Sequence, residues 1–151
     1  MMWITRQRSR HGSLAAVKAG EGYAVTLLHG VGLCADAWGG QFGALSAHFS
    51  LTAFDMPGHG ESPQFDLKEP VLADYAAVVG KNLTEPTALI GHSMGAMIAM
   101  QLAMHPLVTG VVALNAIYQR TLSAQDAIRK RASVMTDSER PDPEPTIKRW
   151  F

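Results

Sequence analysis

Short apolar runs alternate with longer segments of helical periodicity along the first 114 residues of this chain. Apolar runs of strand length are typical of strands covered on both faces. The predicted strands of this kind cover residues 23–28, 51–54, 87–90 and 108–114. The segments between them predict helices over residues 37–49, 71–83 and 95–104. This alternation predicts an α/β fold with a mostly parallel sheet and helices on both faces.

The two ends of the chain have other patterns. Residues 2–5 and 13–18 flank a polar segment and predict an opening hairpin, and Asp36 is the expected N-cap of the helix over 37–49. The chain becomes polar and basic after Asn115, where residues 118–136 predict a helix. Residues 137–145 predict a loop, and residues 146–151 the start of another helix. Because its apolar face needs a cover, we expect the sequence to be interrupted at Phe151.

Loops rich in glycine follow three predicted strands, at residues 29–32, 55–62 and 91–95. Ligands of parallel α/β sheets bind beyond the carboxyl ends of the strands. The three loops therefore predict one site at that edge of the sheet. In the second loop, we expect the carboxylates of Asp55 and Glu61 to fix the loop and not to act in catalysis.

The third loop, Gly91-His92-Ser93-Met94-Gly95, lies between a predicted strand and a predicted helix. Gly-x-Ser-x-Gly in this context is the signature of a nucleophile elbow, a tight turn that exposes the serine. Side chains in place of Gly91 and Gly95 would collide with the strand and the helix. We therefore predict that Ser93 is a nucleophile. The alternative is a tight turn with a structural serine.

Acyl transfer needs two N–H donors that point at the developing oxyanion. The backbone N–H of Met94, directly after Ser93, is the first predicted donor. The second belongs to the loop at 29–32, where Val31 is the predicted donor and Gly32 the alternative. An ordinary strand-to-helix turn is the competing interpretation of this loop.

These motifs resemble those of the α/β-hydrolase-fold serine hydrolases. The resemblance rests on LLHGVG at 27–32 with Trp38, on DMPGHGES at 55–62 and on GHSMG at 91–95. It implies that the second strand pairs in an antiparallel way and that a helical cap follows the sixth strand. Residues 1–117 would then be the N-terminal part of the core, and residues 118–151 the start of the cap. The ending TIKRWF is similar to the cap of 3-oxoadipate enol-lactonases. Scaffold roles are implied for the motif residues His29, Gly30, Gly91, His92 and Gly95.

The family places its acid and then its histidine base after the serine, beyond the cap. Here only His105 follows the motif, about 18 Å along the predicted helix and too far to act. Asn115 occupies a place where some members carry the acid. We expect His92 to point away from the solvent side of the elbow. The base and acid are therefore expected from a missing C-terminal part or a second chain, and this chain alone would be inactive.

The sequence thus predicts a serine hydrolase of small-molecule esters, lactones or thioesters that forms an acyl-enzyme on Ser93. A non-catalytic binding module or receptor is one alternative. A C–C hydrolase or lyase on the same fold is another. A serine in the elbow, where an aspartate would be needed, disfavours an alkyl-enzyme mechanism.

The composition indicates which partners and which cellular compartment to expect. The 13 basic and 13 acidic residues balance, which gives no reason to expect nucleic acid or an anionic membrane as a partner. No apolar run reaches the length of a membrane span, and we expect no secretory signal, because no apolar segment follows the basic residues near the N-terminus. One cysteine, Cys34, fits a reducing compartment, so a cytoplasmic location is expected. We expect no metal and no cofactor, because no ligand cluster has metal-binding spacing.

Overall fold

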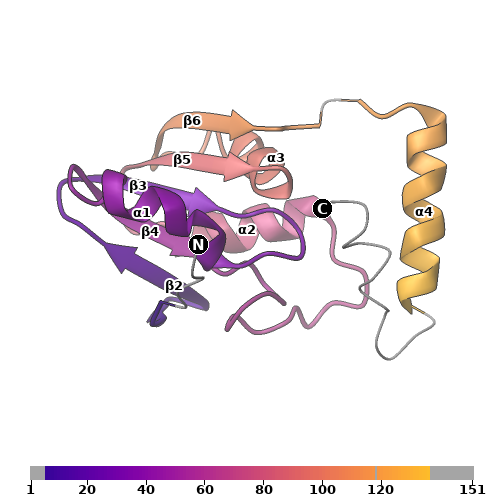
Figure 1. Ribbon diagram of the computed structural model, residues 1–151, viewed down its shortest axis with the longest axis horizontal. Coiled ribbons are helices and arrows are strands. Elements are labelled where there is room, and N and C mark those ends of the chain that lie inside the picture. Colours follow the sequence, from indigo (N-terminus) through magenta and orange to yellow (C-terminus); the bar gives the residue numbers. More distant parts are fainter. Residues whose placement is uncertain (1–5, 118, 137–151) are drawn as a thin grey trace. The chain divides into compact units, whose positions relative to one another are not determined.

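A computed structural model describes residues 6–117 and 119–136 of this chain (Figure 1). The chain divides into two compact units, Met1–Ala116 and Ile117–Phe151. The first unit is built on a six-stranded sheet with the strand order β1-β2-β4-β3-β5-β6. Its strands are β1 (Ser9–His11), β2 (Leu14–Ala19), β3 (Tyr23–Leu28), β4 (Phe49–Phe54), β5 (Thr87–His92) and β6 (Val108–Leu114).

The sheet is mostly parallel, which confirms the predicted fold class. Strand β3 pairs in parallel with β4 and β5, and β5 pairs in parallel with β6. Strand β2 is antiparallel to both β1 and β4. As a result, the chain leaves β3, β4 and β5 at the same edge of the sheet.

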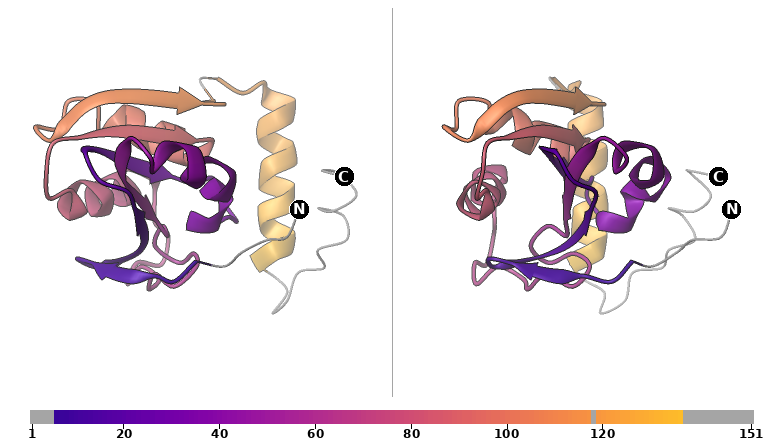
Figure 2. Two further views of the ribbon diagram at one scale, coloured as in Figure 1. Left: turned by 60° about the vertical axis from the view of Figure 1, so that its left-hand side comes forward. Right: turned by 90° about the vertical axis from the view of Figure 1, so that its left-hand side faces the viewer.

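Helices cover both faces of the sheet (Figures 1 and 2). One face packs against α2 (Leu72–Asn82) and α3 (Met94–Gln101), the other against the 3₁₀ turn η1 (Ala35–Trp38) and α1 (Gly39–Leu45). Within β3, Leu28 belongs to the first of these cores and Leu27 to the second, and both are fully buried. Burial on both faces explains why this strand reads as a continuous apolar run.

Several predicted boundaries differ from the structure. The first strand of the hairpin is Ser9–His11, inside the segment read as polar, while residues 2–5 lie outside the described part. The helix expected over 37–49 is only η1 followed by the seven-residue α1, in a glycine-rich segment of low helix propensity. Helix α3 ends at Gln101 and not at residue 104.

The predicted N-cap role of Asp36 is wrong. Cys34 is the N-cap of η1 and its side chain makes no capping hydrogen bond. The buried Asp36 carboxylate instead accepts hydrogen bonds from the backbone N–H of Arg6, at 3.1 Å, and from Nη1 of Arg8, at 2.7 Å. This side chain therefore connects separate segments and does not start a helix.

The second unit contains the helix α4 (Leu122–Thr136) within the stretch predicted to be helical. The hydroxyl of Thr121 accepts a hydrogen bond from the Ala124 N–H at 3.3 Å, as expected at a helix start. The predicted loop at 137–145 and helix at 146–151 lie outside the described residues. None of the helices in the described part is long and apolar enough to cross a membrane.

We expect Leu89→Ala to lower the free energy of unfolding by about 2–5 kcal/mol, because Leu89 is fully buried in the core between the sheet and α2–α3. Met100→Ala on the exposed side of α3 is the matched control and should change it by less than about 0.5 kcal/mol. Urea unfolding followed by circular dichroism measures both. Equal effects of the two substitutions would contradict the assigned core.

Candidate active site

Three loops meet at the carboxyl edge of the sheet. Strand β3 lies between β4 and β5, and all three run in the same direction. His29 follows β3, Asp55 follows β4, and Ser93 follows β5. The structure therefore brings together the three loops that the sequence singled out.

Ser93 has the strained backbone of an elbow. It lies between β5 and α3 with φ 54° and ψ −113°, in a region that non-glycine residues rarely adopt. Its N–H donates to the Leu114 carbonyl at 2.9 Å, and its carbonyl accepts from the Met97 N–H at 3.2 Å. These bonds hold the strained residue between β6 and α3, as strain at a functional site requires.

Glycines at both ends of the motif allow the backbones of β5, α3 and β3 to come into contact. A Cβ on Gly91 would lie 2.2 Å from the carbonyl oxygen of Gly95. A Cβ on Gly95 would lie 2.1 Å from the carbonyl oxygen of Leu28, on β3. Neither position can hold a larger residue without moving backbone. The start of α3 is thereby fixed against β5 and β3.

His29 lies buried beneath the loop that follows β3. Its Nε2 accepts a hydrogen bond from the Met56 N–H at 2.9 Å, so the proton is on Nδ1, which donates to the Gly30 carbonyl at 2.7 Å. Burial lowers the pKa of His29 to about 4, and the ring is neutral at physiological pH. The scaffold residue implied by the resemblance thus joins two loops of the site.

The Gly30 carbonyl fixes the direction of the next N–H group. It accepts from both His29 Nδ1 and the Leu33 N–H, the latter at 3.2 Å. Because a trans peptide directs its C=O and N–H to opposite sides, this carbonyl determines where the Val31 N–H points. Gly32 follows with φ 75°, in the left-handed region that favours glycine. The sequence gives no sign of this role of His29, since Met56 is 27 residues away.

Asp55 fixes the surrounding backbone, as its sequence context predicts. Its buried carboxylate accepts from the Ala35 N–H at 2.7 Å and from the Glu61 N–H at 2.9 Å. For Glu61 the prediction is wrong: within the described residues it contributes its backbone N–H, and no hydrogen bond of its carboxylate is found. Hydrogen bonds from Arg8 and from these two N–H groups lower the pKa of Asp55, although burial alone would raise it.

The described histidines near this edge have partners other than Ser93. His59 Nδ1 lies 3.0 Å from the Pro57 carbonyl, and His92 Nε2 lies 3.3 Å from Asn115 Nδ2. His105 lies between α3 and the start of β6, at the opposite edge of the sheet, and its Nδ1 accepts from the Leu107 N–H. Within the described residues, no side chain is found hydrogen-bonded to the Ser93 hydroxyl.

His92 does not point away from the solvent side as expected. The half-buried ring lines an open cavity of about 280 Å³, together with Gly30, Trp38 and Leu114. Asn115, with φ 53°, has the second strained backbone of this edge and holds the ring by its amide. The cavity lies beside Ser93, since a Cβ on Gly30 would be 3.3 Å from both His92 Nδ1 and Ser93 Cβ.

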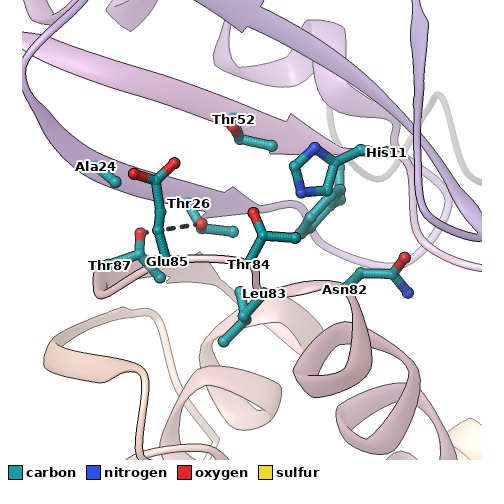
Figure 3. A pocket seen from close by; sticks show the side chains of 10 residues that line it. His11, Ala24, Thr26, Thr52, Asn82, Leu83, Thr84, Glu85 and Thr87 are labelled. Carbon is teal, nitrogen blue, oxygen red and sulfur yellow. Dashed lines mark hydrogen bonds between the residues drawn. The ribbon is translucent and has the colours of Figure 1, made fainter.

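Figure 3 shows the residues that line a second hollow. This hollow has room for about one water molecule. Threonines from three strands line it, and the hydroxyls of Thr26 and Thr87 lie 3.1 Å apart. Thr87 begins β5 whereas Ser93 follows its end, so the hollow is at the other end of that strand. Among the residues that the structure describes, no group of histidine, cysteine, aspartate or glutamate is placed to hold a metal.

We expect the free energy of unfolding to fall as the pH drops from 6.5 towards 4. In this window unfolded chains protonate His29, near its ordinary pKa of 6.5, and folded chains do not. This difference lowers the free energy of unfolding by up to about 3 kcal/mol. Above pH 6.5 His29 is neutral in both states and causes no such loss. Urea unfolding at a series of pH values measures this.

His29→Gln should reduce the pH dependence in that window, with His48→Gln as the control at an exposed site. If both variants kept the slope of the wild type, the neutral state assigned to His29 would be wrong.

Comparison with known proteins supports the fold and site together. The sequence model described as the Alpha/beta hydrolase family matches residues 27–151. A curated relative, (E)-2-((N-methylformamido)methylene)succinate hydrolase of Acinetobacter baylyi, is 34% identical over 156 residues, which cover 100% of this chain and 59% of the relative. The pimeloyl-[acyl-carrier protein] methyl ester esterase of Aeromonas salmonicida is 36% identical over 106 residues, 64% of this chain and 41% of the esterase.

A solved structure, that of E-2-(acetamidomethylene)succinate hydrolase, is similar with a TM-score of 0.72 and 27% identity, covering 84% of this chain and 50% of that one. The chain thus spans between 41% and 59% of the length of these relatives. Because the family match covers most of the sequence and the sheet, loops and elbow agree with it, this chain belongs to the alpha/beta hydrolase family.

Proposed function

We propose that the protein is a serine hydrolase with Ser93 as its nucleophile. The observation that carries this proposal is the strained Ser93 between β5 and α3, held where Gly91 and Gly95 bring the backbones into contact. A residue held in such a conformation is typical of a functional site, and the motif is that of a nucleophile elbow. The hydrolase and esterase relatives support the same reaction class.

In this mechanism the Ser93 hydroxyl attacks the substrate carbonyl, and the carbonyl oxygen becomes an oxyanion. The Met94 N–H is at the first position of α3, where helix geometry leaves it without an internal partner. Together with the Val31 N–H it donates to the oxyanion, and each such donor lowers the barrier by about 3 kcal/mol. Collapse releases the leaving group and forms an acyl-enzyme, which water then hydrolyses.

A histidine and a carboxylate outside the described residues complete this mechanism. They remove the Ser93 proton and return it to the leaving group. The partners found for His59, His92 and His105 support this assignment, because none of these rings is bonded to Ser93. In this proposal the pair comes from a further C-terminal part of the protein or from a separate chain.

The substrate is a small molecule with an ester, lactone or thioester carbonyl. A second candidate class is an N-acyl group, an amide. It is favoured by the similarity over the whole chain to (E)-2-((N-methylformamido)methylene)succinate hydrolase. A non-catalytic receptor on the same fold is the alternative that the following experiment decides.

The protein, with every chain that accompanies it, should hydrolyse p-nitrophenyl acetate. Ser93→Ala should lower kcat/KM at least about 10³-fold, because the variant has no atom to form the acyl-enzyme. Ser123→Ala, at an exposed position of α4, is the control and should keep the activity of the wild type. Wild-type protein that binds but does not turn over esters or N-acyl amides would contradict the hydrolase and favour the receptor.

A further inference from the structure

The guanidinium of Arg8 lies between the carboxylates of Asp36 and Asp55, and we call these three side chains the buried ion cluster. Their exposed fractions are 4%, 4% and 0%. Arg8 precedes β1, Asp36 lies in η1, and Asp55 follows β4. The mechanism proposed above uses none of the three.

Arg8 makes four hydrogen bonds in this cluster. Nη1 donates to Asp36 Oδ2 at 2.7 Å and to the Arg6 carbonyl at 2.7 Å. Nε donates to Asp55 Oδ2 at 3.1 Å, and Nη2 to Asp55 Oδ1 at 3.4 Å. Only the planar, multi-donor head of arginine can contact both carboxylates in this way.

The two carboxylates extend the cluster to the backbone of three segments. Asp55 accepts from the N–H groups of Ala35 and Glu61, and Asp36 accepts from the N–H of Arg6. The segment before β1 and the loops after β3 and β4 are therefore joined through side chains that are separated from water.

Arg8 and Asp55 carry their charges. Burial alone would lower the pKa of Arg8, but its hydrogen bonds with Asp55 and Asp36 raise it above the ordinary value. The pKa of Asp55 is lowered. A cluster of one cation and two anions is stable in a dry site only while the cation is present, because its removal leaves two buried carboxylates uncompensated.

The cluster holds the far end of the loop that carries the Val31 N–H. His29 holds the Gly30 carbonyl at the start of this loop, and Asp55 holds the Ala35 N–H four residues after Val31. Val31 itself is 70% exposed, so side-chain packing does not fix its backbone. A shift of about 1 Å in a catalytic donor can cost about 10²-fold in rate.

We propose that Arg8 is a positioning residue of the active site: through Asp36 and Asp55 it sets the place of the Val31 N–H that binds the oxyanion. This inference rests on the proposed function. It predicts that loss of Arg8 weakens binding of the transition state more than binding of the substrate.

The test compares Arg8→Met with Arg10→Met, the same substitution at an exposed arginine two residues along the chain. In the complete protein, Arg8→Met should lower kcat about 10- to 100-fold with KM within about 3-fold, while Arg10→Met leaves both unchanged. Arg8→Lys keeps the positive charge but cannot contact both carboxylates in the same way. Its kcat should lie between those of Arg8→Met and Arg10→Met. Wild-type kcat in Arg8→Lys and Arg8→Met, or a loss confined to KM, would overturn the proposal.

A second readout does not depend on turnover. Amide NMR signals of Val31 and Ala35 should shift in Arg8→Lys and not in Arg10→Met, and unchanged signals in Arg8→Lys would overturn the proposal. If Arg8→Met does not fold, Arg8→Lys carries both readouts. An inactive wild type would reject the proposed function, while the NMR comparison would still decide the role of Arg8.

Discussion

The structure depends on backbone contact between the elbow and the strand beside it. Gly91 meets the first turn of α3, and Gly95 meets the carbonyl of Leu28 at the end of β3. These contacts leave no room for a side chain, so they fix how α3 leaves the sheet. Ser93, the residue between the two glycines, is held in a conformation that an isolated peptide would avoid. The geometry of the candidate nucleophile thus follows from close packing of main chain.

Two sets of buried polar side chains hold the loop after β3, which carries Val31. One is the neutral His29, and the other is the buried ion cluster. His29 is kept neutral by burial, and its two nitrogens join the loops after β3 and β4. Arg8 is joined to the carboxylates of Asp36 and Asp55 by buried ion pairs. Both sets give hydrogen bonds to polar groups that would otherwise be costly to bury. Both also bind backbone groups on either side of Val31. The loop is therefore oriented by side chains beneath it and not by its own exposed side chains.

The sequence predicts best those elements whose burial or turn geometry follows from a local pattern of residues. Strand β3 and strand β6 have the predicted bounds, and the elbow lies where its glycines place it. The short β1, Ser-Arg-His, has no apolar pattern, because its pairing with β2 and not its own burial makes it a strand. The roles of Asp36 and His29 could not be read from sequence, since their partners lie 28 and 27 residues away. Such polar contacts exist only once the sheet has brought its loops together.

The attacking role of Ser93 is the central claim, and covalent labelling tests it most directly. The complete protein would be treated with a serine-directed fluorophosphonate, digested and analysed by peptide mass spectrometry. We predict one stoichiometric adduct, located on Ser93 of the elbow peptide, and its loss in Ser93→Ala. An unlabelled protein, or an adduct on another residue that persists in Ser93→Ala, would contradict the claim.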